Sequence, residues 1–187
     1  MNSNKGVLRL IGGKYRSRLI RVPARPGLRP TPDRVRETLF NWLGQDLAGL
    51  VCLDLYAGSG ALGFEAASRA AARVVMVERD RAALAALQRS RDALGAEQVA
   101  IVGGDATAYL ARSRERFDVV FLDPPFRQNA VPAILEQLGR RLQPRARVYV
   151  EAHRPVEASA QWQELKRGKA GQVSYQLLQW DGNEGRR

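Results

Sequence analysis

The sequence predicts a doubly wound α/β domain with a mostly parallel sheet and an antiparallel edge strand, preceded by an N-terminal β-hairpin and helix. Two observations predict this fold. From residue 50 onward, short continuous apolar runs alternate with helical stretches rich in Ala, Leu and Arg, which is typical of a parallel sheet covered on both faces. Before residue 50, the pattern changes to that of a hairpin followed by a helix.

The hairpin and the first helix are indicated by their turn and capping residues. Gly12-Gly13 separates residues 7–11 from residues 14–22, and a Gly-Gly pair between such runs is a turn signal. Thr31-Pro32 predicts an N-cap followed by proline at the first helical position, with the helix running to about Leu43. One face of this helix is apolar and consists of Val35, Leu39, Trp42 and Leu43.

The body is predicted to hold five buried strands with helices between them. The strands are Val51–Tyr56, Arg73–Val77, Gln98–Val102, Phe117–Leu122 and Arg147–Val150. The helices are Ala61–Ala70, Arg81–Leu94, Ala106–Arg112 and Ala130–Leu142. After a turn at Gly168–Gly171, a last strand over Val173–Trp180 is expected to be antiparallel at the sheet edge.

Composition excludes several classes of protein. The 187 residues suit one domain, and 45% apolar with 26% charged residues suits a folded core rather than a disordered chain. No run approaches the ~20 apolar residues of a spanning helix, and no signal peptide is recognised, so we expect a cytoplasmic protein without a membrane partner. With Cys52 and His153 as the only cysteine and histidine, we expect no metal site. Because no heptad or exposed apolar stripe demands a dimer, we expect a monomer.

Positive charge is concentrated at the N-terminus. The chain carries 30 Lys and Arg against 19 Asp and Glu, a net charge of +11. Residues 1–36 hold ten basic side chains and a single acidic one, Asp33, whereas residues 37–126 hold nine basic and twelve acidic. This asymmetry predicts that the N-terminal segment binds a polyanion while the body performs different chemistry. The alternative is that the arginines merely solvate the surface.

The end of the first body strand carries a glycine-rich turn. Gly58, Gly60 and Gly63 fit the dinucleotide fingerprint, and Glu78 ends the next strand, where it would accept ribose hydroxyls. However, Asp54 lies four residues before the first glycine and would repel a pyrophosphate. A carboxylate there suits a cationic amine, which S-adenosylmethionine has. The turn also has a purely structural interpretation, in which the glycines pack helix against strand.

Two further strand ends carry polar side chains. Asp105 follows the third strand and would accept a hydrogen bond from an adenine amino group, although Asp is also a common N-cap. The fourth strand ends in Asp123-Pro124-Pro125-Phe126. The Asp123 carboxylate and the Pro124 carbonyl would present two acceptors to one NH₂ group, and Phe126 offers a face on which a base can stack. Held in this way, an amine directs its lone pair at a methyl donor.

These motifs resemble the amino-methyltransferases that modify nucleobases through an Asp/Asn-Pro-Pro-aromatic motif. More specifically, the chain is similar to the bacterial 16S rRNA guanine-N2 methyltransferase family (RsmD-type), with Tyr56 standing where Phe is expected and Ser17 where Gly is common. The similarity covers nearly the whole chain and rests on Arg9–Arg18, Leu28–Leu43, Leu53–Gly63, Phe117–Phe126 and Gly168–Tyr175.

The resemblance implies a Rossmann-like class I methyltransferase sheet and a role for each motif. The substrate would be one guanine of small-subunit rRNA, within a ribosomal subunit or assembly intermediate, and the cofactor S-adenosylmethionine. Residues 1–45 would form a basic RNA-binding extension of a methyltransferase domain over residues 46–187. The base would be held by Asp123, Pro124, Pro125 and Phe126. The cofactor would be held by Asp54, Tyr56, Ala57, Gly58, Ser59, Gly60, Glu78, Arg79, Gly104, Asp105 and Ala106. RNA phosphates would be bound by Arg9, Lys14, Arg16, Arg18, Arg29, Arg34 and Arg36.

Three other functions remain open on the residues alone. An adenine-N6 methyltransferase of DNA or RNA would share the Asp-Pro-Pro-aromatic motif, although the chain has no room for a separate DNA-recognition domain. A nicotinamide-dependent oxidoreductase would use Gly58–Gly63 but would leave Asp123–Phe126 unexplained. A non-enzymatic RNA-binding protein would need only the basic segment.

Overall fold

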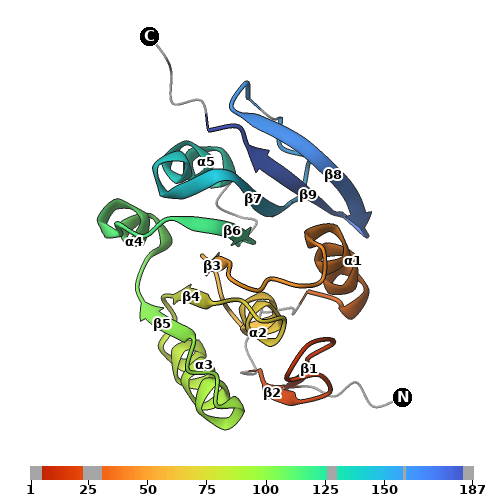
Figure 1. The fold of residues 1–187 in the computed structure, drawn as a ribbon, viewed down its shortest axis with the longest axis vertical. Coiled ribbons are helices and arrows are strands. Elements are labelled where there is room, and N and C mark those ends of the chain that lie inside the picture. Colours follow the sequence, from red (N-terminus) through yellow and green to blue (C-terminus); the bar gives the residue numbers. More distant parts are fainter. Residues whose placement is uncertain (1–5, 23–30, 126–129, 158, 183–187) are drawn as a thin grey trace.

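A seven-stranded sheet with helices on both faces forms the body of the protein, and a small hairpin lies beside it (Figure 1). The structure, a computed structural model, describes residues 6–22, 31–125, 130–157 and 159–182. Its strands are β1 (Val7–Arg9), β2 (Leu19–Arg21), β3 (Val51–Asp54), β4 (Arg73–Glu78), β5 (Val99–Gly103), β6 (Phe117–Leu122), β7 (Leu142–Ala152), β8 (Trp162–Ala170) and β9 (Val173–Trp180). Its helices are α1 (Asp33–Leu43), α2 (Ala61–Ser68), α3 (Arg81–Leu94), α4 (Ala106–Arg112), α5 (Val131–Leu138) and the 3₁₀ turn η2 (Gly139–Arg141).

The sheet has the order β5-β4-β3-β6-β7-β9-β8. The first five strands in this order pair in parallel, and β9 pairs antiparallel with both β7 and β8. The chain moves outward from β3 to β5 and then returns to β6 on the other side of β3. This reversal is a topological switch point, and open α/β sheets bind ligands beyond the strand ends at such a point. The predicted doubly wound, mostly parallel sheet is confirmed.

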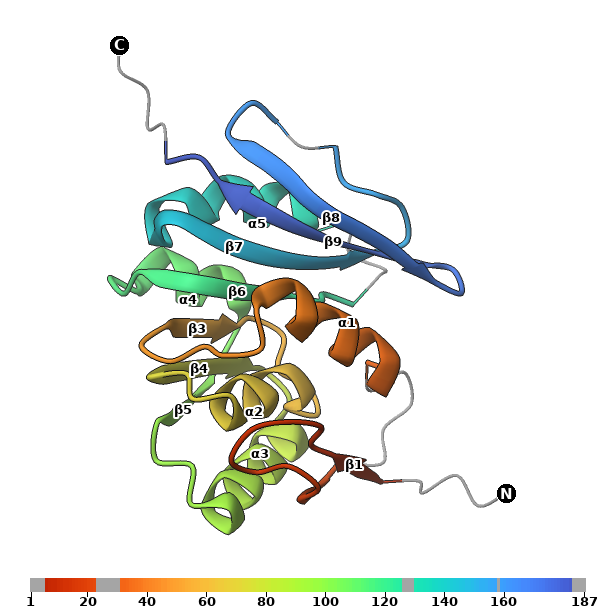
Figure 2. The ribbon, with the colours of Figure 1, turned by 45° about the vertical axis from the view of Figure 1, so that its right-hand side comes forward.

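Helices cover both faces of the sheet (Figure 2), and an apolar core lies on each face. Helices α1, α2 and α3 pack on one face. There, the ring centroids of Phe40 of α1 and Phe121 of β6 lie 5.9 Å apart. Helices α4 and α5 pack on the other face. Because side chains alternate along a strand, every second residue of β3, β6 and β7 faces α1 and α2. This alternation decides which polar side chains meet at the strand ends.

The C-terminal part of the sheet differs from the prediction. Gly168 does not lie in a turn: it belongs to β8, opposite Tyr175, and the turn joins Ala170 to Val173. The edge strand is therefore β8, and β9 is internal. Strand β8 was missed because most of its side chains are polar and exposed, as is common for an edge strand that must not pair with other chains. Gly168 is required because a Cβ atom there would lie 2.3 Å from the ring of Tyr175.

The start of the first helix also differs from the prediction. The N-cap of α1 is Pro32, and no side chain caps the helix. Thr31 instead donates a hydrogen bond from its hydroxyl to Glu151, 3.3 Å away on β7. The predicted N-cap of Thr31 is therefore wrong, because a buried carboxylate in the neighbouring strand takes its hydroxyl. The predicted apolar face is confirmed for Val35, Leu39 and Leu43, which are buried, while Trp42 is half-buried.

The hairpin is docked on α2 through the Gly12-Gly13 pair. The amides of Ile11 and Gly12 donate to the two carboxylate oxygens of Glu65, at 2.9 and 2.8 Å. A Cβ atom at Gly13 would lie 1.8 Å from the carbonyl oxygen of Ser68. The predicted antiparallel pairing is confirmed, but the predicted turn at Gly12-Gly13 is wrong: the strands are only Val7–Arg9 and Leu19–Arg21, and residues 10–18 connect them. The two glycines instead allow the backbone to approach α2 closely.

In the part of the chain that the structure describes, no helix combines the length and the apolar character needed to cross a membrane.

Candidate active site

The predicted cofactor residues meet at the carboxyl ends of three neighbouring strands. Glu78, the last residue of β4, connects the loops on both sides of it. The Gly58 amide donates to Glu78 Oε2 at 2.9 Å, and the Gly104 amide donates to the Glu78 main-chain carbonyl at 2.9 Å. The Ala57 amide donates to the carbonyl of Val77 at 3.0 Å. The loops after β3 and β5 are thus fixed against the end of β4.

The carboxylate of Glu78 has a fixed orientation. Oε1 accepts hydrogen bonds from the amides of Arg79 at 2.9 Å and Asp80 at 2.8 Å, while Oε2 accepts the bond from Gly58. Carboxylate oxygens together offer about four acceptor sites, and the three amides leave capacity for a further donor at Oε2. A ribose hydroxyl fits this remaining capacity.

Asp54 is buried at the end of β3 behind the glycine turn. Its Oδ2 accepts a hydrogen bond from the Gly63 amide at 3.1 Å. Burial raises the pKa of Asp54 to about 7; the amides of Gly63 and Tyr56 oppose this rise, and the charge of Glu78 adds to it. A carboxyl group in this state is stabilised as the anion by an incoming cation, which suits an ammonium group and opposes a pyrophosphate.

The glycines of the turn are explained by packing. Gly60 has φ +79°, and a Cβ atom there would lie 2.6 Å from the ring of Phe64 and 2.7 Å from Leu87. A Cβ atom at Gly63 would lie 2.4 Å from Met76 of β4. Packing of the helix against the strand is therefore sufficient to explain why these two positions are glycine. The features that fit a cofactor are the carboxylates of Asp54 and Glu78, which surround the turn.

Asp105 caps α4. Its Oδ1 accepts hydrogen bonds from the amides of Thr107 and Ala108, at 2.9 and 3.1 Å, and from the Thr107 hydroxyl. The Thr107 hydroxyl is the largest cause of the lowered pKa of Asp105. The side chain is exposed, and Oδ2 accepts no hydrogen bond from the described part of the chain, so capping and adenine recognition are compatible. The other predicted cofactor residues follow the same three strands: Tyr56 and Ser59 lie after β3, Arg79 lies after β4, and Ala106 is the first residue of α4 after β5.

Three carboxylates form a row at the ends of neighbouring strands. Asp54 pairs with Phe121 across β3 and β6, and Leu122 pairs with Val150 across β6 and β7. Asp123 directly follows β6, and Glu151 is the next residue of β7, so Asp54, Asp123 and Glu151 follow one another along the strand ends. The pKa of Asp123 is raised well above its usual value by burial first, then by the charges of Glu151 and Asp54. We name these three side chains the carboxylate row.

Glu151 was not predicted from the sequence. Its Oε1 accepts hydrogen bonds from the hydroxyls of Tyr149 at 2.8 Å and Thr31 at 3.3 Å, and burial raises its pKa. A signal was available, because Glu151 follows the apolar run Arg147–Val150, and the ends of the other strands had already supplied the candidate residues.

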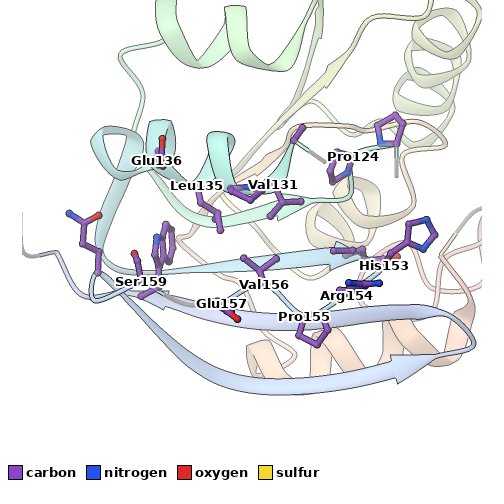
Figure 3. A pocket seen from close by; sticks show the side chains of 17 residues that line it. Pro124, Val131, Leu135, Glu136, His153, Arg154, Pro155, Val156, Glu157 and Ser159 are labelled. Atoms are coloured by element: carbon purple, nitrogen blue, oxygen red, sulfur yellow. The ribbon is translucent and has the colours of Figure 1, made fainter. Parts of the chain in front are cut away.

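A pocket of about 530 Å³ lies beside this row, with Pro124, Pro125 and Glu151 among its lining residues. Figure 3 shows Val131 and Leu135 of α5 pointing across it toward Val156. Phe126, the predicted stacking residue, lies outside the described residues. The pocket therefore offers an apolar space directly beside the Asp-Pro-Pro motif.

The predicted phosphate-binding residues differ in their exposure to solvent. Arg9, Lys14, Arg16 and Arg34 are exposed. Arg18 is also exposed and donates to the carbonyl of Ala93 on α3 at 2.9 Å. Arg29 lies outside the described residues.

Arg36 corrects the prediction. Its side chain is fully buried and contacts Asp33 at 2.6 Å and Glu65 at 3.5 Å. It also donates to the carbonyl of Arg9 at 2.9 Å. The predicted phosphate contact is wrong, because the guanidinium itself is fully buried and is bound by Asp33, Glu65 and the Arg9 carbonyl, which connects α1 to the hairpin. Glu65, which also pairs with Arg69 at 3.0 Å, is the buried anion that the sequence interpretation missed.

The order of strands, with a switch point beside β3 and an antiparallel strand beyond β7, defines the protein as a Rossmann-like class I methyltransferase fold. The family model described as "Conserved hypothetical protein 95" matches residues 8–179. The chain belongs to this family, which the resemblance to the 16S rRNA methyltransferases had indicated.

Relatives and a solved structure agree with this assignment. "Ribosomal RNA small subunit methyltransferase D" of Escherichia coli (strain K12) is 42% identical over 185 residues, covering 95% of this chain and 92% of the relative. The protein of the same name from Haemophilus influenzae is 40% identical, covering 94% and 95%. The solved structure of yhhF from Escherichia coli matches with a TM-score of 0.86 at 42% identity, covering 94% of this chain and 99% of that one.

Proposed function

We propose that the protein transfers a methyl group from S-adenosylmethionine to the exocyclic N2 amine of a guanine in small-subunit rRNA. The names of its relatives support the reaction and the class of RNA. The observation that carries the proposal is the register that pairs Asp54 with Phe121, two residues before Asp123, so that both carboxylates lie at the strand ends of the switch point and each affects the charge of the other. One carboxylate suits the ammonium of the cofactor, and the other suits the amine of the base.

The cofactor would be held by three carboxylates with different tasks. We assign the ammonium group to Asp54, the ribose hydroxyls to Glu78 and the adenine amine to Asp105. When bound, S-adenosylmethionine supplies a methyl group already activated by a sulfonium. The chain therefore has to position the acceptor amine and remove its proton.

The amine would be positioned by the Asp-Pro-Pro motif. The nitrogen of an exocyclic amine is a poor nucleophile because its lone pair is delocalised into the ring. The Asp123 carboxylate and the Pro124 carbonyl would each accept one N–H, which favours a more tetrahedral nitrogen. Methylation leaves one excess proton on the nitrogen, and we assign its acceptance to Asp123. The raised pKa of this carboxyl suits that role.

The RNA would be bound by the exposed cations of the hairpin and α1. A base that is methylated on its pairing edge must leave its stack, and extrusion needs tight binding of the flanking phosphates. The hairpin and α1 supply exposed positive charge through Arg9, Lys14, Arg16, Arg18 and Arg34. Their binding should weaken steeply with salt.

The proposal is tested by methyl transfer from radiolabelled S-adenosylmethionine. Small ribosomal subunits from cells lacking the protein are compared with free rRNA and with DNA, using the wild type and Asp123→Ala. We expect label in subunits with the wild type, and about a hundred-fold less or lower still with the variant, because positioning and proton removal are both lost. Label in DNA alone, or in no substrate, would contradict the proposal.

A further inference from the structure

Glu151 has no task in the reaction described above, although it lies at the end of the carboxylate row. Its side chain is buried, with the residue 7% exposed, and it adjoins Asp123 on the neighbouring strand. Placing two carboxyl groups side by side in a buried site destabilises their ionised forms. The fold therefore keeps an acceptor at this position at a cost in stability.

The surroundings of Glu151 orient its carboxylate. The hydroxyls of Tyr149 and Thr31 both donate to Oε1, and Tyr149 is fully buried. Oε2 accepts no hydrogen bond within the described ranges. Glu151 is also one of the residues that line the pocket beside Pro124. One oxygen of Glu151 is thus held by the protein, and the residue borders a space large enough for a ligand.

The pairing edge of guanine matches two adjacent acceptors. Guanine presents the N2 amine and, next to it, the N1–H group, and both are donors. Adenine presents its amine beside an N1 that carries only a lone pair. A carboxylate next to the acceptor of the amine therefore attracts guanine and repels adenine.

We propose that Glu151 is a specificity-determining residue that accepts the N1–H of the target guanine, with Thr31 and Tyr149 as positioning residues that hold its carboxylate. This inference rests on the proposed function and adds the selection of the base to it. It also assigns a role to the Thr31 side chain, which connects the segment before α1 to the end of β7.

The test uses small subunits reconstituted with rRNA in which the target guanine is replaced by 2-aminopurine. This base keeps the amine at position 2 but has neither the N1–H nor the O6 of guanine, and the variant of Glu151 separates the effect of N1 from that of O6. Wild type should methylate guanine with a kcat/KM about 10- to 100-fold above that for 2-aminopurine, as expected for one lost buried hydrogen bond. In Glu151→Gln this preference should disappear, because the amide NH₂ can donate to the unprotonated N1. The exposed Glu97→Gln serves as the matched control and should keep the wild-type preference.

Each outcome is decisive. If Glu151→Gln loses the same share of activity on both bases, the substitution has damaged the structure. If it keeps the preference for guanine over 2-aminopurine, Glu151 does not select the base. Both results overturn the inference. If Glu151→Gln fails to fold, Thr31→Val replaces it. We expect Thr31→Val to reduce the preference for guanine about 3- to 10-fold, the effect of one weakened hydrogen bond, and to leave the KM for S-adenosylmethionine unchanged. An unchanged preference overturns the inference. A wild type that methylates neither base refutes the proposed function itself.

Discussion

Arg36 Nη1 lies 3.5 Å from Glu65 Oε2, and both side chains are fully buried. This ion pair joins α1 to α2, and the same carboxylate accepts the amides of the hairpin. The segment that carries the exposed cations is thereby fixed to the sheet that carries the carboxylate row. The RNA contacts proposed for the hairpin and the chemistry proposed for the strand ends would thus be held in one geometry by a buried charge cluster.

Removing one partner of this pair should destabilise the fold strongly. Glu65→Gln leaves two buried guanidinium groups, Arg36 and Arg69, without their shared anion, so we expect the free energy of unfolding to fall by about 3–5 kcal/mol. Urea titration followed by circular dichroism measures the change. Arg34→Gln, an exposed neighbour on α1, should change it by less than about 1 kcal/mol. Equal effects of the two variants would contradict a structural role for the pair.

Ser17 should be replaceable by glycine with a gain in stability. Its φ of +66° lies in the left-handed region, which explains why glycine is common at this position in the family that the sequence resembles. We expect Ser17→Gly to raise the free energy of unfolding by about 0.5–1 kcal/mol. Ala111→Gly, in the last turn of α4, should lower it by up to about 1 kcal/mol. The sign of the Ser17 change in urea titration decides this prediction.

Asp54 should make the protein less stable as the pH rises. Its pKa is 3.8 in the unfolded chain and about 7 when folded, so the folded state binds the proton more tightly. The resulting stability is fully present below about pH 4 and is lost as the pH rises to about 7, a difference of about 4 kcal/mol. Asp54→Asn removes this dependence, so the variant should gain stability relative to wild type between about pH 5 and pH 8. Parallel pH profiles of the unfolding free energy would contradict this account.

The same substitution should weaken cofactor binding. The amide that Asp54→Asn introduces carries no charge for the ammonium group, so we expect Kd for S-adenosylmethionine to rise about ten-fold or more at pH 8. In wild type the affinity should increase from about pH 6 to pH 8 as Asp54 ionises, whereas the affinity of the variant should be flat. Calorimetric titration measures both. A variant that binds as tightly as wild type would remove Asp54 from the cofactor site.

The hairpin cations should affect RNA binding and leave cofactor binding unchanged. We expect Arg16→Ala with Arg18→Ala to raise KM for the subunit about ten-fold or more and to reduce the salt dependence, since two phosphate contacts are lost. The KM for S-adenosylmethionine should stay within about two-fold. Arg112→Ala with Arg114→Ala, at the end of α4 and just beyond it, is the control for net charge. An unchanged KM for RNA in the hairpin variant would count against the basic segment as the RNA contact.

Most of the fold could be predicted because its strands are buried on both faces. Apolar runs such as Phe117–Leu122, interrupted only by Asp118, fit strands buried in a parallel sheet, and α3 and α4 have the predicted bounds. Strand β8 could not be found in this way, since its pairing depends on β9 and not on an apolar face. The hydrogen bond of the Thr31 side chain could not be predicted either, because its partner Glu151 lies 120 residues away in the sequence.

The candidate site was predictable where a residue type at a strand end implied its chemistry. Asp54, Glu78 and Asp123 come together because carboxyl ends of parallel strands share one edge of the sheet. Arg36 was misjudged because helical spacing alone does not reveal a buried anion on another helix. The sequence shows charge, but only packing decides which charges reach the solvent.

The central claim is the identity of the methylated atom, and nucleoside mass spectrometry tests it most directly. Small subunits from cells lacking the protein are incubated with it and S-adenosylmethionine, and the rRNA is digested to nucleosides. We predict a gain of N2-methylguanosine with the wild type and none with Asp123→Ala. A gain of N6-methyladenosine instead, or of N2-methylguanosine with both proteins, would contradict the account.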